Sequence, residues 1–262
     1  MTSPTPRQSM AVEPGRGRCA WSAGGSRIMG ERRTITLRLL GSWDLAVQGA
    51  PVHTGARQQR LLAALAIHGP RSRHYLAGLL WPECPEDHAL GSLRAAVFAL
   101  SRRVPGALEG GGDLALSGAV DVDLHRLLEL VVRPVASWSA EQDDAWVLDR
   151  PRVALLPGWY DDWVVEEQAR LQELYVNAVE ERAELCLVRG EVHHALALAR
   201  TVRDAAPLRE SAVRLLLRAH LALGNEAEAR RAFQEYRSAL AAELGEQPSD
   251  RVRGLLEPRR RR

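Results

Sequence analysis

The sequence predicts a mainly α-helical protein with a small antiparallel β component. An N-terminal winged helix-turn-helix precedes a C-terminal all-α repeat domain of the tetratricopeptide (TPR-like) type. Two observations lead to this fold class. Residues 34–130 present short strand-like stretches, three helical stretches and a further pair of strand-like stretches, which is the order of a winged helix. Beyond residue 155, helical patterns recur with a shift of 34 residues, the tetratricopeptide period.

Composition excludes several classes of protein. The 35 basic residues are all arginine, so P-loop and Schiff-base lysine chemistry is excluded. The three cysteines are widely separated, and neither a signal peptide pattern nor an apolar run long enough to span a membrane is present. We expect a cytoplasmic protein that binds no membrane, metal or cofactor. It is not expected to be an enzyme, because no nucleophile–base pair or cofactor loop is visible.

Charge is unevenly distributed along the chain. Residues 51–105 carry seven Arg against three acids, a net charge of +4. Residues 106–189 carry seven Arg against seventeen acids, a net charge of −10. A basic block followed by an acidic block indicates two modules with different partners, with chance variation among solvated faces as the alternative.

The N-terminal elements follow from alternation and turn residues. Strands are expected at residues 34–40, 43–47 and 51–53, and the first two helices at residues 55–68 and 72–81. Gly69-Pro70 ends the first of these helices, and Ser72 is placed to cap the second. Residues 113–116 and 120–124 alternate around Ser117-Gly118, and we interpret them as a hairpin that forms the wing.

The third helix, over residues 86–104, is the candidate recognition helix. At helical period its apolar side carries Leu90, Leu93, Val97, Leu100 and Val104, its opposite side carries His88, Ser92, Ala95, Ala99 and Arg102, and Phe98 and Arg103 lie on the flanks. The side opposite the apolar stripe is small, polar and basic, as a helix in a DNA major groove requires. An ordinary amphipathic helix with a solvated back is the alternative. The order of elements, the basic block and the following hairpin favour DNA.

The C-terminal part contains a repeat. Four pairs of identical residues stand 34 positions apart: Leu187 and Leu221, Gly190 and Gly224, Ala195 and Ala229, and Arg203 and Arg237. Pro207 separates the two units. Ahead of them, Trp159, Tyr160 and Trp163 form an aromatic cluster, which we expect to pack at the module junction rather than to bind a ligand. Asp161 or Asp162 can cap the long helix that follows.

Several motifs resemble the SARP-like regulators. Residues 57–62 (RQQRLL), 80–82 (LWP), 92–94 (SLR) and 122–124 (VDL) resemble an OmpR/PhoB-type winged helix. Residues 156–164 (LPGWYDDWV) and 244–249 (LGEQPS) resemble the bacterial transcriptional activator domain, BTAD. The resemblance implies a bacterial transcriptional regulator of the short form, usually an activator, that binds double-stranded DNA and contacts RNA polymerase. The chain departs from the family at Ala95 and Ala99, where polar groups are common, and at Asp113, where the wing starts with an acid.

We therefore predict a sequence-specific DNA-binding regulator whose third helix enters the major groove. Its repeat domain would serve self-association or contact with RNA polymerase. The candidate DNA-binding residues are Arg57, Arg60, His88, Ser92, Arg94, Ala95, Phe98, Arg102 and Arg103. Plain solvated arginines are the alternative for Arg57 and Arg60, and packing is the alternative for Phe98. A helical interaction scaffold whose winged domain no longer binds DNA is the alternative function, favoured by the low charge of the recognition face.

These expectations divide the chain into five parts. They are a disordered tail at residues 1–33, a winged-helix DNA-binding domain at 34–130, a linker at 131–154, the activator domain at 155–256 and a basic tail at 257–262. A start at Met29 would remove most of the first tail.

Overall fold

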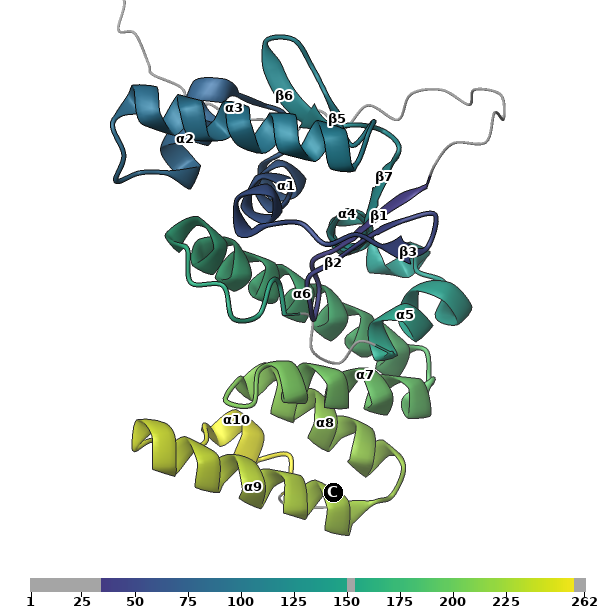
Figure 1. Ribbon diagram of the computed structural model, residues 1–262. Helices are drawn as coiled ribbons and strands as arrows, with labels where there is room; N and C mark the ends of the chain where they lie inside the picture. Colours follow the sequence, from purple (N-terminus) through teal and green to yellow (C-terminus); the bar gives the residue numbers. More distant parts are fainter. Residues whose placement is uncertain (1–33, 150–153, 257–262) are drawn as a thin grey trace, which may run out of the picture. The chain divides into compact units, whose positions relative to one another are not determined.

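The computed structural model describes residues 34–149 and 154–256. The two expected tails lie outside these ranges. The described chain starts with small sheets and three helices and continues into a series of longer helices (Figure 1). This arrangement confirms the expected fold class. No described helix is both long enough and apolar enough to cross a membrane.

A four-stranded sheet opens the described chain. Its strands, in spatial order, are β3 (Ala50–Pro51), β2 (Asp44–Val47), β1 (Ile35–Arg38) and β7 (Val120–Val122). β1 pairs antiparallel with β2, so that Ile35 lies opposite Val47. β1 also pairs with β7, and this pairing is parallel. Alternate residues Ile35 and Leu37 are buried, as a strand with one covered face requires.

Three helices that pack on one another come after β3 along the chain: α1 (Ala56–His68), α2 (Arg73–Leu80) and α3 (Glu86–Arg103). Gly69 ends α1 with φ of 72°, a backbone conformation that glycine adopts without strain. The Ser72 hydroxyl accepts a hydrogen bond from the Tyr75 amide at 3.2 Å, which confirms the expected cap of α2.

A second sheet of three strands contains the wing. Its strands, in spatial order, are β4 (Arg71–Ser72), β6 (Asp113–Leu116) and β5 (Leu108–Glu109). The hairpin joins β5 to β6, so the expected pairing of residues 113–116 with 120–124 is wrong. Glycines 110–112 make the tight connection; a side chain at Gly110, whose φ is 116°, would meet the Asp113 carbonyl oxygen. After β6 the chain turns at Ser117 and leaves to pair with β1 as β7.

The segment between the two modules is helical and packed. It contains α4 (Asp123–Val132), the 3₁₀ turn η1 (Val135–Ser137), the π-type turn η2 (Ala140–Asp144) and α5 (Ala145–Leu148). The Asp123 carboxylate accepts hydrogen bonds from the amides of Leu39 and Leu40, which ties the start of α4 to the end of β1. Trp138 and Val147 are buried, so the segment expected to be a linker contributes to the core.

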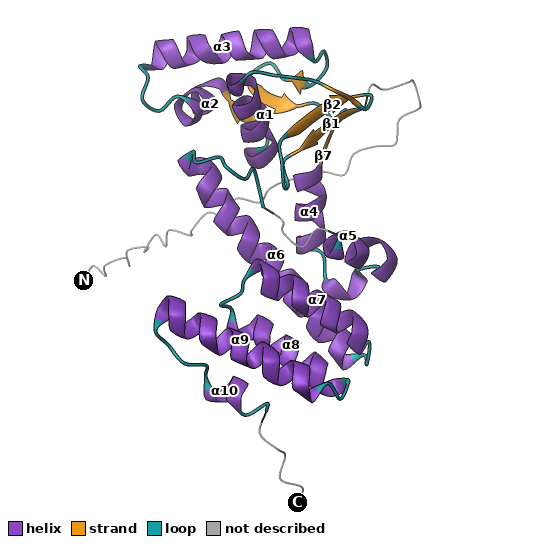
Figure 2. Cartoon of the chain, turned by 60° about the horizontal axis from the view of Figure 1, so that its bottom comes forward, coloured by secondary structure: helices purple, strands orange, loops and turns teal. Residues whose placement is uncertain are grey.

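The C-terminal helices form two consecutive hairpins and a short final helix (Figure 2). They are α6 (Asp162–Val188), α7 (Val192–Ala205), α8 (Glu210–Ala222), α9 (Glu226–Leu244) and α10 (Asp250–Arg253). The 34-residue repeat is confirmed at the turns. Gly190 and Gly224 both have positive φ, and each donates its amide to the carbonyl three residues earlier. Ala195 and Ala229, one turn further on, are both buried and admit the neighbouring helix closely.

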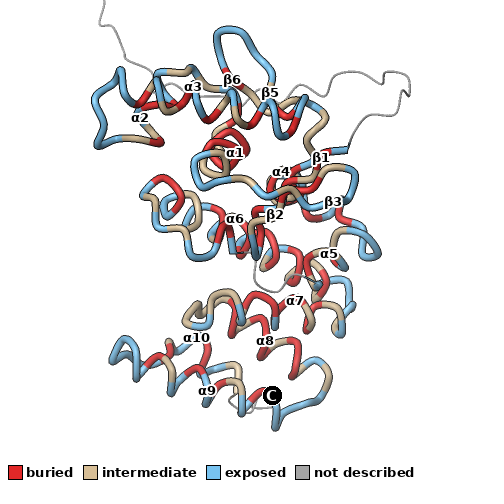
Figure 3. The backbone as a smooth tube through the Cα atoms, viewed as in Figure 1, coloured by how far each residue is buried: buried red, intermediate tan, exposed pale blue. Residues whose placement is uncertain are grey.

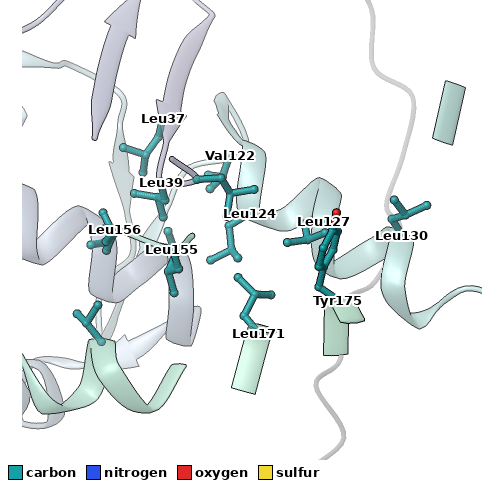
Figure 4. Close-up of a cluster of buried hydrophobic side chains, with 14 of the residues drawn as sticks. Leu37, Leu39, Val122, Leu124, Leu127, Leu130, Leu155, Leu156, Leu171 and Tyr175 are labelled. Atoms are coloured by element: carbon teal, nitrogen blue, oxygen red, sulfur yellow. The ribbon is translucent and has the colours of Figure 1, made fainter. Parts of the chain in front are cut away.

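One hydrophobic core continues from the sheet into the helical repeats. Buried residues follow the inner sides of the elements from β1 to α8 (Figure 3). In the close-up, Leu37 and Val122 from the sheet lie on one side of Leu124, and Leu127 of α4 lies beside Tyr175 of α6 (Figure 4). A smaller cluster involves α8, α9 and α10. Because α4 and α6 share a core, α6 is anchored to the winged helix.

Candidate nucleic-acid interface

α3 is held from one side only. Its buried residues are Ala89, Leu93, Ala96 and Leu100, with Val104 buried just after the helix. They face α1 and α2, and Figure 2 shows no helix or strand of the described residues over the opposite side. Most of the outward side chains are exposed. α3 is therefore a well-supported helix with a free face, as a recognition helix needs to be.

The buried side of α3 differs from the predicted one. At 100° per residue, its centre is rotated by about 40° from the expected stripe. Ala89 and Leu100 lie nearest the centre and Ala96 lies at its edge, whereas Leu90 and Val97 are only half-buried. With these small alanines buried, the larger Leu90 and Val97 lie on the flank of the buried side. The outward face is consequently centred on Gly91 and Phe98.

Seven of the predicted DNA-binding residues belong to α3. Five of them lie on or near the outward face, and the other two, Ser92 and Arg103, lie to its sides. His88, Arg94, Ala95, Phe98, Arg102 and Arg103 are exposed, and Ser92 is half-buried. By helical position Ser92 and Arg103 border the buried side. Phe98 is 65% exposed although it is the largest apolar side chain of α3. The Arg102 guanidinium carbon lies 5.7 Å from the centre of its ring, in a cation–π contact.

The arginines of α3 are available to an anionic partner. Within the part of the chain that the structure describes, Arg94, Arg102 and Arg103 form no ion pair. Arg94 Nε donates to the Leu90 carbonyl oxygen at 3.2 Å, which holds its side chain against the helix. Arg102 and Arg103 also lie in the last turn, where a positive charge stabilises the helix dipole. That stabilising role remains the purely structural explanation for these two residues.

The two candidates on α1 differ from each other. Arg57 is exposed in the first turn of the helix. Arg60 instead pairs with Asp161, with 2.5 Å between Nη2 and Oδ1, and both side chains are about three-quarters buried. The structure thus leaves Arg57 open to a phosphate and assigns Arg60 a partner within the chain.

The wing brings little positive charge of its own. Residues 108–116 contain no arginine, and Glu109 and Asp113 are exposed. The nearest basic group that the sequence interpretation missed is Arg71. It lies on β4, which pairs with β6, and its guanidinium carbon stands 5.4 Å from the centre of the Tyr75 ring. The basic block alone would have identified Arg71 as a candidate.

Aromatic side chains join the winged helix to the start of α6. Trp43 stacks on Trp159 with 5.8 Å between ring centres, and His68 meets Trp163 at the same distance. Burial lowers the pKa of His68, because a desolvated imidazole resists protonation; neighbouring charges contribute less. Tyr160 is 85% exposed and takes no part in this packing. The sequence therefore predicted the junction role for two of its three aromatic residues.

One buried cluster has the residue types of a metal site. Candidate ligand atoms of Asp144, Cys186 and His194 lie within 4.8 Å of one another in the described chain. Arg182 already neutralises this carboxylate, with 2.6 Å between Nη2 and Oδ2 of Asp144. Burial also raises the pKa of the Cys186 thiol to about 11, so the thiolate that a metal requires is disfavoured. The arrangement suits a structural ion pair better than a cation.

Comparisons with known proteins place these features in a family context. Residues 149–258 match the family model described as the bacterial transcriptional activator domain. The chain is 30% identical over 264 residues to the regulatory protein AfsR of Streptomyces coelicolor, covering 89% of this chain and 26% of that protein. It is 29% identical over 220 residues to AfsR of Streptomyces griseus, covering 78% and 22%. The chain thus spans about a quarter of the length of these curated relatives.

A solved structure shows a similar fold. The structure of Mycobacterium tuberculosis EmbR in complex with a low-affinity phosphopeptide matches with a TM-score of 0.66 and 24% sequence identity. The match covers 86% of this chain and 64% of that one. The order of a winged helix followed by helical repeats is therefore shared with a solved protein. The matching family is one of transcriptional activators and is not an enzyme class.

Proposed function

We propose that this chain, which belongs to the SARP-like regulators by its winged helix and its bacterial transcriptional activator domain, regulates transcription by binding double-stranded DNA. In this proposal α3 enters the major groove, and the protein acts in the cytoplasm as an activator. Arg94, Arg102 and Arg103 would contact phosphates or base edges, while Ala95 permits close approach.

The outward face of α3 carries this proposal. It combines exposure and small side chains with Arg94 and Arg102, and Arg103 lies at its border; none of the three forms an ion pair among the described residues. Its acids, Glu86 and Asp87, are confined to the first turn, and Glu86 already accepts a hydrogen bond from His74 at 2.7 Å. A positive and sterically open helix beside a hairpin wing fits a DNA groove. Arg57, at the start of α1, is positioned as a further phosphate contact.

The helical repeats supply the second half of the proposed function. We place the division between the two modules at residues 131–154 and assign the helices beyond it to self-association or to contact with RNA polymerase. Packed helix pairs offer extended surfaces for protein partners. Because α4 and α6 share a buried core with the sheet, a partner bound to the repeats would be held in a fixed relation to α3.

Selection of genomic DNA tests the proposal. The purified full chain is incubated with sheared DNA of the bacterium that carries its gene, and retained fragments are sequenced and footprinted. We expect a small set of promoter-adjacent sites, and we expect the triple variant R94A/R102A/R103A to retain none of them. Failure of the wild-type chain to enrich any sequence at low salt, together with a stable protein partner, would support the scaffold alternative.

A further inference from the structure

We propose that Phe98 and Arg102 read a thymine and a nearby guanine as one unit. Phe98 would contact the 5-methyl group of the thymine, and Arg102 would donate to O6 and N7 of the guanine. The inference rests on the proposed DNA binding by α3. It adds a specificity-determining pair and a defined base pattern to that function.

The exposure of Phe98 is the first supporting observation. Its side chain is 65% exposed and lies almost opposite the buried side of α3. Burying such a ring would yield on the order of 2 kcal/mol, so an interior position would be favoured if folding alone decided it. Its neighbours on the face, Gly91 and Ala95, are small and leave the ring as the most prominent group. An apolar group of this kind complements the thymine methyl, the apolar feature of the major groove.

The contact between Phe98 and Arg102 is the second observation. The guanidinium carbon stands 5.7 Å from the ring centre, which restricts the arginine to one region of the face. A guanidinium held in this way still presents N–H donors at its edge, and bidentate donation to guanine is the commonest specific arginine contact. Because the ring already restricts the Arg102 side chain before DNA binds, less side-chain conformational entropy is lost on binding.

Helix geometry limits how far apart the two bases can lie. Phe98 and Arg102 are four residues apart, which corresponds to about 6 Å along a helix. Successive base pairs are stacked about 3.4 Å apart. A thymine contacted by Phe98 and a guanine contacted by Arg102 should therefore lie within about two base pairs of each other. Arg94 lies about one helical turn before Phe98. Its Nε donates a hydrogen bond to the Leu90 carbonyl oxygen of the same helix, and we assign Arg94 to phosphate contact.

Base analogues in the footprinted operator test this pair directly. Each thymine is replaced in turn by deoxyuridine, which pairs normally but lacks the 5-methyl group. Each nearby guanine is replaced by 7-deazaguanine, which lacks the N7 acceptor. Affinities are measured by fluorescence anisotropy for the wild-type chain, Phe98→Ala, Phe98→Leu, Arg102→Ala and the control Arg94→Ala. Because these side chains are exposed, the variants should fold, and thermal unfolding checks this.

At one or two thymines, deoxyuridine should weaken wild-type binding about fourfold, the value of one buried methyl-sized group. The loss should vanish in Phe98→Ala, persist in part in Phe98→Leu and remain in Arg94→Ala. A guanine within two base pairs should show the same coupling to Arg102→Ala. Equal deoxyuridine effects in wild type and Phe98→Ala at every thymine would overturn the inference, as would a change of oligomeric state as the sole effect of Phe98→Ala. Absence of any DNA binding would instead overturn the proposed function itself.

Discussion

Arg60 of α1 donates to Asp161, the residue before α6, across 2.5 Å between Nη2 and Oδ1. The pair joins the winged helix to the first helix of the repeats. Asp161 occupies the N-cap position of α6, yet its carboxylate makes no hydrogen bond to a helix amide. The ion pair therefore engages the carboxylate of Asp161, one of the two candidate caps that the sequence offered. Arg60 is thereby directed to the module junction and away from a role at phosphate.

Removing this pair should lower stability without altering DNA binding. Arg60→Met keeps the aliphatic stem, and Asp161→Asn keeps the shape of the acid. We expect each change to lower the free energy of unfolding by about 1–2 kcal/mol, since a partly buried charged hydrogen bond is removed. The double variant should be destabilised by less than the sum of the two. Urea denaturation measures all three.

Arg57→Ala is the matched control, because Arg57 is exposed one turn earlier on α1. It should leave the unfolding free energy nearly unchanged. If Arg60→Met reduced the salt dependence of operator binding by about one phosphate contact, Arg60 would be the DNA anchor predicted from the sequence and this account of the junction would be incorrect.

The buried pair of Arg182 in α6 and Asp144 in η2 should be the most sensitive polar contact between the repeats and the segment before them. Asp144 is fully buried, and its carboxylate also accepts from His194 Nε2 at 2.7 Å. Arg182→Met would leave that carboxylate without its main partner, and we expect a loss of about 3–5 kcal/mol. The double variant R182M/D144L, which removes both charges, should recover much of this loss in the same denaturation experiment. Equal losses in the single and double variants would contradict the explanation by an uncompensated charge.

Backbone conformation should decide the effect of alanine at the repeat turns. A Cβ at Gly224 would meet no atom within 4 Å, so its φ of 73° is the only obstacle. Gly224→Ala should therefore cost about 1 kcal/mol in unfolding free energy. Gly78, in the middle of α2, also has open space but no positive φ. Gly78→Ala should be neutral or stabilising by up to about 1 kcal/mol. If Gly224→Ala had a higher melting temperature than Gly78→Ala, the explanation by backbone conformation at the repeat turns would be wrong.

Acid should weaken the junction through His68. Burial lowers the pKa of this imidazole from its ordinary value of 6.5, so the unfolded chain binds the proton more readily than the folded one. Stability is then complete above about pH 6.5 and decreases as the pH falls through that value towards the lower pKa of the folded state. His68→Phe removes the titrating group while keeping an aromatic ring beside Trp163.

The unfolding free energy of His68→Phe should decline less than that of wild type between about pH 7.5 and about pH 5.5. A residual decline is expected, because burial also lowers the pKa of His220. Identical pH profiles for wild type and His68→Phe would exclude His68 as a contributor.

Local patterns were enough to predict most of the elements. The cap at Ser72, the stop at Gly69 and the 34-residue repeat each depend on a few neighbouring residues, and the structure confirms all three. Strand pairing depends on partners distant in sequence. The sequence could not show that β7 would join β1, more than 80 residues away, and this is why the wing was assigned to the wrong pair of strands.

The sequence predicted that residues 86–104 form a helix, but it did not predict correctly which side of that helix faces outward. Hydrophobicity alone favoured Leu90 and Val97 as buried residues, whereas the packing of α3 on α1 and α2 buries Ala89 and Ala96 instead. The difference moved Phe98 from a flank to near the centre of the outward face. The partner of Arg60 lies 101 residues along the chain, beyond what spacing can reveal.

The salt dependence of operator binding tests the central claim, that α3 is the DNA-contacting helix. Affinities of the wild-type chain and of the R94A/R102A/R103A variant are measured between about 50 and 200 mM salt. We predict a linear decrease of log affinity with log salt for wild type, and a slope smaller by about two to three units in the variant, roughly 0.9 for each phosphate that is no longer neutralised. Gly78→Ala, on α2, should keep the wild-type slope. An unchanged slope and affinity after replacement of all three arginines would show that α3 does not bind DNA.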